Sequence, residues 1–178
     1  MNHYELCKLT ADRFLKESDV ILYEYNTVIS NELPDVLCFK KGYTKLFEIK
    51  ISHSDFKNDS KKDSRSKIKT KYWPYFERHN DKIKKLLWGK PEMKEFIMEA
   101  PHLGSERYYV CPAGMIQPDE IYCWGLYWVK NNKFYKKKKS KIFRRNIHLE
   151  ISLLTHAFRK FASQENTNIL INTYEVSK

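Results

Sequence analysis

The chain lacks any long apolar run, and this absence narrows the kinds of protein it can be. No stretch approaches the roughly 18–20 consecutive apolar residues that cross a bilayer. The first residues contain no basic segment followed by an apolar one, so we expect no secretory signal and a cytoplasmic location. Internal repeats and a recognisable linker are missing too, so residues 1–178 are expected to fold as a single domain.

Closely spaced cysteine pairs are also missing. The four cysteines are scattered and form no C-x-x-C pair: Cys7, Cys38, Cys111 and Cys123. Three of them fall in segments that we predict to be strands. This spacing favours buried thiols in a reducing compartment over a zinc or redox centre.

Acidic residues are absent from residues 130–145, which contain nine basic ones. The whole chain has 33 Lys and Arg against 22 Asp and Glu, a net charge of +11. Such an excess favours a polyanionic partner, with nucleic acid first and an anionic membrane surface second. Hydrophobic residues make up 42% of the chain and aromatic residues 15%, which is too much for a disordered protein.

The apolar pattern predicts an α/β fold with a mixed central sheet flanked by helices. Ser52 or Ser54 offers an N-cap for a helix that begins near Asp55. The order of elements is an opening helix over 3–17, a strand over 20–29, a hairpin, the helix near Asp55, a helical pattern over 80–99, strands over 107–112 and 121–129, and a last helix over 147–162.

The hairpin carries the clearest chemical signal. Residues 36–39 and 44–51 read as its strands, with a turn centred on Lys41-Gly42. This register places Asp35 directly opposite Glu48, and cross-strand partners share a face of the sheet. Strand side chains alternate, so Lys50 joins the same face. The sequence therefore predicts two carboxylates and an ammonium group at one end of the sheet.

These groups suit a hard divalent cation, Mg²⁺ or Mn²⁺, which prefers oxygen ligands. Asp35 and Glu48 could supply carboxylates, and the carbonyl of Ile49 a third oxygen. Such a cation polarises a phosphate and acidifies a water molecule. Lys50 would orient the nucleophile or stabilise charge growing on the phosphoryl oxygens.

The acid-x-Lys triplet alone is a weak signal, because it occurs four times in this charged chain. Only Glu48-Ile49-Lys50 lies on an apolar strand with a Pro-Asp pair placed opposite it. The other Pro-Asp pair, Pro118-Asp119, has no such triplet after it and reads as a loop turn.

The combination of Pro34-Asp35, Glu48-Ile49-Lys50 and a preceding helix and strand resembles the PD-(D/E)xK nuclease superfamily. The segments 48–59 and 107–121 are similar to its MmcB-like and phage-borne branch of DNA-repair endonucleases. The likeness covers residues 3–129. It implies a restriction-endonuclease-like fold, with Asp35 and Glu48 as metal ligands and Lys50 as the catalytic lysine. Members of this branch often have an arginine where Pro34 stands.

The resemblance also implies an acidic residue from the opening helix. Glu5 is the best placed, with Glu17 and Glu24 as alternatives. Asp55, on the next helix, could orient Lys50 or a water molecule. The alternative is that Asp55 only interacts favourably with the helix dipole, as an aspartate in the first turn of any helix does.

Two basic segments are candidates for nucleic-acid binding. One follows the predicted strand that carries Lys50, and the other is the segment 130–145. In the second segment aromatic residues alternate with the basic residues, and they either stack on nucleobases or anchor the segment to the core. The candidate residues are Lys57, Lys61, Lys62, Arg65, Lys67, Lys136, Lys137, Lys138, Lys139, Arg144 and Arg145.

The sequence therefore predicts a metal-dependent deoxyribonuclease that acts in DNA repair, recombination or phage DNA processing. RNA remains an alternative substrate, and a homodimer is allowed because superfamily members that cut both strands often dimerise. A nucleic-acid-binding protein that keeps the fold without cutting is the second hypothesis. A membrane-surface protein, with residues 141–162 as its amphipathic helix, is the third.

Overall fold

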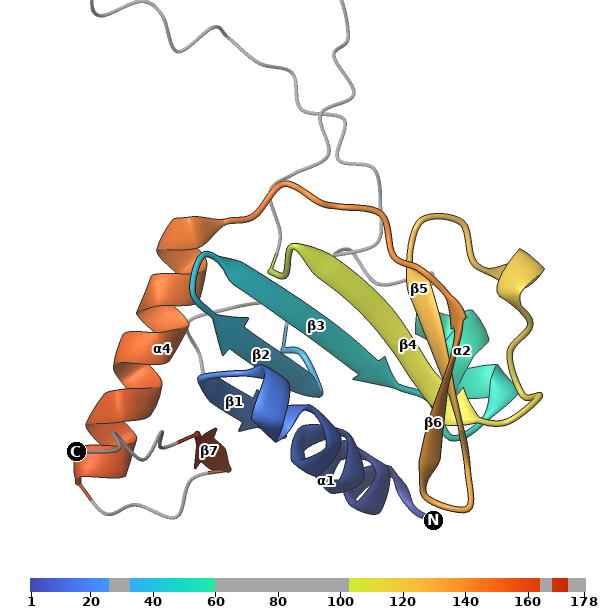
Figure 1. Cartoon of the computed structure of the whole chain (residues 1–178), viewed down its shortest axis with the longest axis horizontal. Coiled ribbons are helices and arrows are strands. Elements are labelled where there is room, and N and C mark those ends of the chain that lie inside the picture. Colours follow the sequence, from blue (N-terminus) through green and yellow to red (C-terminus); the bar gives the residue numbers. More distant parts are fainter. Residues whose placement is uncertain (26–32, 60–102, 164–167, 173–178) are drawn as a thin grey trace, which may run out of the picture.

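A computed structural model of the chain describes residues 1–25, 33–59, 103–163 and 168–172 (Figure 1). Its centre is a seven-stranded mixed sheet with the order β6-β5-β4-β3-β2-β1-β7. The pairs β3–β4 and β4–β5 are parallel, and the others are antiparallel. The strands are β1 (Val20–Tyr23), β2 (Val36–Lys40), β3 (Tyr43–Ile49), β4 (Glu106–Pro112), β5 (Gly125–Lys130), β6 (Lys133–Lys138) and β7 (Ile169–Ile171). The predicted α/β class with a mixed sheet is confirmed.

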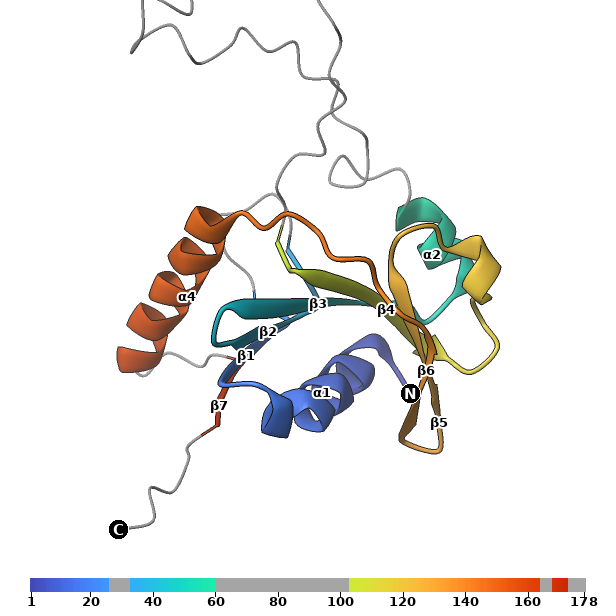
Figure 2. The ribbon, with the colours of Figure 1, turned by 45° about the horizontal axis from the view of Figure 1, so that its top comes forward.

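Helices cover both faces of this sheet. The α-helices are α1 (His3–Phe14), α2 (His53–Asp59) and α4 (Ile147–Ala162), and short 3-10 helices occupy Leu15–Glu17 and Pro118–Glu120. Figure 2 shows α1 on one side of the sheet and α2 and α4 on the other. The predicted last helix has the bounds that the apolar pattern indicated.

Each face of the sheet has its own core because strand side chains alternate. On the α1 face, Phe14 stacks on Phe47 with ring centroids 4.5 Å apart, and both are buried. On the opposite face, Leu37 and Leu46 pack with Leu153 of α4. These two cores fix the helices relative to the sheet, and so determine which helical side chains lie at the ends of the strands.

The β2–β3 hairpin has the predicted register. Leu37 pairs with Leu46 and Phe39 with Thr44. Gly42 has φ +71°, which glycine adopts without steric cost, so the tight turn at residues 41–42 needs it. This register places the N-terminal end of β2 beside the C-terminal end of β3.

Several expectations differ from the structure or lie outside it. The strand predicted over 121–129 begins only at Gly125, and β7 was not predicted. Strand β1 ends at Tyr23 rather than at residue 29, and residues 26–32 are outside the described ranges. The basic segment contains an unpredicted edge strand, β6, which a turn with positive φ at Asn131 and Asn132 joins to β5. The predicted helix over 80–99 is also outside the described ranges.

None of the helices in the described ranges has the length and apolar character that a bilayer crossing needs.

Candidate functional site

Three carboxylate residues stand side by side across adjacent strands at one end of the sheet. The last paired residues are Tyr23 with Val36, and Val36 with Phe47. Continuing each ladder by one residue places Glu24 beside Asp35 and Asp35 beside Glu48. A backbone bond supports the first step, because the Glu24 N–H donates to the Asp35 carbonyl at 2.8 Å.

The side chain of Asp35 bridges this row to its neighbours. Its Oδ2 accepts a hydrogen bond from the backbone N–H of Ile49 at 2.6 Å. The same oxygen lies 3.4 Å from Nε2 of His3, in the first turn of α1. The hydrogen bond to Asp35 is the main reason why the pKa of His3 is raised. Ile49 thus enters the site through its N–H, and a ligand role for its carbonyl stays a prediction.

Lys50 is held in a buried group of charges on the other side of Glu48. Its Nζ lies 3.5 Å from Glu48 Oε2 and 3.0 Å from Asp59 Oδ1, and the side chains of all three are at most 3% exposed. Asp55 lies at 4.0 Å and is 43% exposed, consistent with the predicted contact to Lys50. Tyr109 of β4 donates from its hydroxyl to Asp59 at 2.7 Å.

The sequence did not single out Asp59, although it carried a signal for it. Ser52 caps α2 by accepting the Asp55 N–H at 3.2 Å, as predicted. A helix that begins at His53 places residues 55 and 59 on one face, four apart. Both aspartates therefore face Lys50 from the same helix.

Of the three acidic candidates, Glu24 is hydrogen-bonded to Asp35 through its backbone N–H. Glu5 instead closes a capping box with Asn2: each side chain accepts the other's backbone N–H at 2.8 Å. Glu17 pairs with Arg13 and Lys45 at distances of 2.8 and 3.3 Å. The contacts of Glu5 therefore favour a helix cap over the catalytic role predicted for it.

His3 and Cys7 were also missed as site residues. They stand four apart on α1 and so share a helix face. Cys7 Sγ donates to Glu24 Oε1 at 3.0 Å, and His3 Nδ1 lies 3.1 Å from the same oxygen. Cys7 is fully buried, and burial, followed by the hydrogen bond to Glu24, raises its pKa. The prediction of a buried thiol is right, but the thiol has polar neighbours.

The basic residues predicted to bind nucleic acid fall into several groups. Lys57 on α2 and Lys136, Lys137, Lys139 and Arg144 near β6 are exposed, whereas Lys61, Lys62, Arg65 and Lys67 lie outside the described ranges. A row of lysines on an edge strand also blocks pairing with another sheet. Two aromatic residues of this segment, Phe134 and Phe143, each pack against a core and anchor it, whereas Tyr135 is exposed.

Two of these basic residues are engaged inside the fold, which argues against their predicted role. Arg145 donates to Glu150 from Nη2 at 2.6 Å and from Nε at 2.9 Å, and to the Gly42 carbonyl at 2.7 Å. Lys138 donates to the carbonyls of Pro118 and Ile121. These bonds join the start of α4 to the β2–β3 turn and β6 to the loop before β5. The two side chains therefore stabilise the scaffold rather than a phosphate contact.

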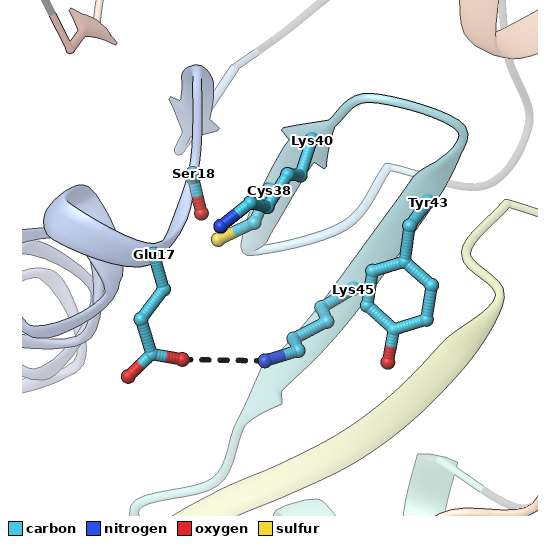
Figure 3. Close-up of a pocket in the computed structure, with 6 residues that line it drawn as sticks. All are labelled: Glu17, Ser18, Cys38, Lys40, Tyr43 and Lys45. Atoms are coloured by element: carbon cyan, nitrogen blue, oxygen red, sulfur yellow. Dashed lines mark hydrogen bonds and ion pairs between the residues drawn. The ribbon is translucent and has the colours of Figure 1, made fainter. Parts of the chain in front are cut away.

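A small pocket lies near the turn end of the β2–β3 hairpin, away from the carboxylate row (Figure 3). Its volume is about 160 Å³, below the roughly 300–1,000 Å³ of typical ligand pockets. Glu17 and Lys45 form an ion pair across it, and the other lining residues are Ser18, Cys38, Lys40 and Tyr43. We assign no chemistry to this pocket.

Comparisons with known proteins give a fold and no function. No family model matches the chain, and no curated protein does. Among solved structures, the SPO1766 protein of unknown function from Silicibacter pomeroyi is similar, with a TM-score of 0.51 and 16% identity. The match covers 92% of this chain and 91% of that one. At this identity the likeness shows the fold alone.

Proposed function

We propose that this protein is a Mg²⁺- or Mn²⁺-dependent deoxyribonuclease of restriction-endonuclease-like architecture. The observation that carries the proposal is the hairpin register, whose last pair is Val36 with Phe47, so that Asp35 and Glu48 stand opposite each other one residue further on. Lys50 directly follows β3, and its Nζ lies 3.5 Å from Glu48 Oε2. Two carboxylates at the ends of adjacent strands, Asp35 and Glu48, with an ammonium group beside Glu48, match the requirements of phosphodiester hydrolysis.

The donor set fits a hard divalent ion. Asp35 and Glu48 would hold it through carboxylate oxygens, which Mg²⁺ prefers. The Ile49 N–H donates to Asp35 and so fixes one carboxylate beside the strand that carries the other. A bound Mg²⁺ would polarise the scissile phosphate and lower the pKa of an attacking water molecule.

The protein's own part in the reaction falls to the group around Lys50. Asp59 and Glu48 hold the Lys50 ammonium group at the end of the sheet, and the more exposed Asp55 lies on the solvent side of the same group. From this position Lys50 would orient the nucleophile or offset charge that develops on the phosphoryl oxygens. The exposed lysines of β6 would contribute sequence-independent attraction to the DNA backbone.

One observation favours the second hypothesis, a protein that binds nucleic acid without cutting it. The Lys50 side chain is 3% exposed, and its Nζ already has two carboxylate partners within 3.5 Å. A phosphate could reach this ammonium group only after some rearrangement of α2 or of the acids. A non-cutting protein would need no such movement.

The test is an assay of labelled duplex, branched and single-stranded DNA and RNA with Mg²⁺, Mn²⁺ or chelator. We expect cleavage that needs the metal and falls about 100-fold or more in Asp35→Asn and Lys50→Ala, with DNA binding retained. Asp119→Asn is the matched control, because Pro118-Asp119 is the same dipeptide with an exposed aspartate, in a 3-10 helix rather than in the predicted loop turn. Salt-sensitive binding without cleavage by the unmodified protein would favour the second hypothesis. A variant series that cuts like the wild type would refute the proposed site.

A further inference from the structure

A second group of potential metal ligands shares Glu24 with the carboxylate row and lies on the α1 face of the sheet. It comprises His3, Cys7 and Glu24, whose donor atoms all lie within 4.8 Å of one another. Within the described ranges, this is the place where three donors of this kind come together. The cluster mixes imidazole, thiol and carboxylate, unlike the all-oxygen set of Asp35 and Glu48.

The distances match those of a tetrahedral site. Cys7 Sγ is 3.0 Å from Glu24 Oε1 and 3.6 Å from His3 Nδ1, and that nitrogen is 3.1 Å from the same carboxylate oxygen. Zinc bonds of roughly 2.0–2.3 Å at tetrahedral angles separate such ligands by roughly 3.3–3.6 Å. The three atoms need to move apart by only a few tenths of an ångström to hold one ion.

The remaining nitrogen of His3 has the partner that a metal-bound imidazole requires. Its Nε2 lies 3.4 Å from Asp35 Oδ2. Histidine ligands almost always donate their second ring N–H to a carboxylate, carbonyl or water, which fixes the ring and its tautomer. Asp35 would therefore orient His3 for this second ion, from outside its ligand shell.

The backbone also delivers the three ligands from two elements. His3 and Cys7 are one turn apart on α1, whose start is fixed by the Asn2–Glu5 capping box. Glu24 directly follows β1, and its φ of +46° turns the chain out of the strand. Cys7 is fully buried, whereas the side chains of His3 and Glu24 are 35% and 30% exposed. One side of the cluster is thus open to solvent for a fourth ligand.

We propose that His3 Nδ1, Cys7 Sγ and Glu24 Oε1 form a zinc site with water as the fourth ligand. Nitrogen and thiolate donors favour Zn²⁺ over the hard ions of the neighbouring carboxylate pair. On binding, the Cys7 thiol releases its proton to solvent and forms the metal–sulfur bond. The ion would fix the first turn of α1 to the end of β1, next to Asp35.

Cobalt titration tests this proposal, because Co²⁺ replaces Zn²⁺ and a cobalt–thiolate bond gives a near-ultraviolet charge-transfer band. We expect one equivalent of Co²⁺ to produce this band in the full-length protein, and Zn²⁺ to displace it. Cys7→Ser should abolish the band, and His3→Gln should weaken zinc binding by about 10-fold or more. Cys123→Ser is the matched control, because its partly exposed thiol is outside the cluster.

Circular dichroism of each variant separates lost ligands from lost structure, and His3→Gln changes a side chain that is only partly buried. A titration without the band, or a band that Cys7→Ser retains, would overturn the zinc site. The measurement uses neither DNA nor Mg²⁺, so its outcome is independent of the proposed nuclease activity.

Discussion

Asp59→Asn is the sharpest test of the charge group around Lys50. The substitution keeps the shape of the side chain and removes its charge. Asp59 is fully buried, lies 3.0 Å from Lys50 Nζ and accepts the Tyr109 hydroxyl at 2.7 Å. Removing one partner of a buried ion pair costs about 3–5 kcal/mol, because the other charge is left without compensation. The asparagine oxygen still accepts a neutral hydrogen bond, so we expect a loss of about 2–3 kcal/mol.

The matched control is Asp55→Asn on the same helix. Asp55 lies 4.0 Å from the same ammonium group but is 43% exposed. Exposed ion pairs contribute about 0–1 kcal/mol, so this variant should lose at most about 1 kcal/mol. In a domain of this size each kcal/mol lowers Tm by about 2–4 °C. Asp59→Asn should therefore melt about 4–12 °C below the wild type.

Urea unfolding followed by circular dichroism measures both variants. The midpoint should fall in Asp59→Asn while the slope m stays unchanged, since the folded surface is the same. Equal losses in the two variants would refute the reasoning, because burial would then not decide the strength of the interaction. A more stable Asp59→Asn protein would mean that the desolvation of Asp59 outweighs its attraction to Lys50.

Two further predictions concern the packing of the sheet. Gly125→Ala should lower the free energy of unfolding by about 1–3 kcal/mol, because an added Cβ would lie 2.2 Å from ring carbons of the buried Tyr108; a melting curve like that of the wild type would contradict this close approach. In native protein at pH 8, a thiol reagent should label Cys123 fastest, and denaturant should expose the other three thiols. These three are Cys7, Cys38 and Cys111, and burial raises the pKa of each thiol, to about 12 in Cys38 and about 11 in Cys111. Rapid native labelling of all four would contradict their burial.

The part of the site that the sequence predicted is the part that local geometry determines. Asp35 and Glu48 are joined by one hairpin, whose turn needs Gly42 and whose alternation allows a single useful register. Lys50 follows by the period of two. These positions required no knowledge of how helices pack.

The missed residues lie on helices, and their place depends on packing across the sheet. Asp59 reaches Lys50 only because Phe56 packs edge-on against Tyr109, with ring centroids 5.2 Å apart. His3 reaches Asp35 only because α1 lies against the opposite face, with Phe14 stacked on Phe47. Helical spacing identified the faces of these helices but not which strand end each would meet.

Strand β6 was missed for a different physical reason. Four of its six residues are lysines, and they give no apolar alternation. An edge strand tolerates such a composition because the backbone N–H and C=O groups on its outer side face solvent. Charged side chains on that strand prevent these groups from pairing with another chain. Its pairing with β5 depends on the turn at Asn131 and Asn132, and on Phe134, which packs into the α1-side core.

The charge distribution links the two proposed metal sites. The protein has a net charge of +11, yet one end of its sheet gathers five carboxylates around Lys50 and His3: Glu24, Asp35, Glu48, Asp55 and Asp59. Buried and partly buried carboxylates are stable as anions only beside cations or hydrogen-bond donors. Lys50 contacts Glu48, Asp55 and Asp59 on the α2 side, and His3 contacts Glu24 and Asp35 on the α1 side. A divalent ion at Asp35 and Glu48 would remove the remaining repulsion between this end and a DNA phosphate, whereas the lysines of β6 attract the backbone from a distance. Asparagine at position 35 removes part of that repulsion together with a metal ligand, so the Asp35→Asn variant should lose cleavage and still bind DNA.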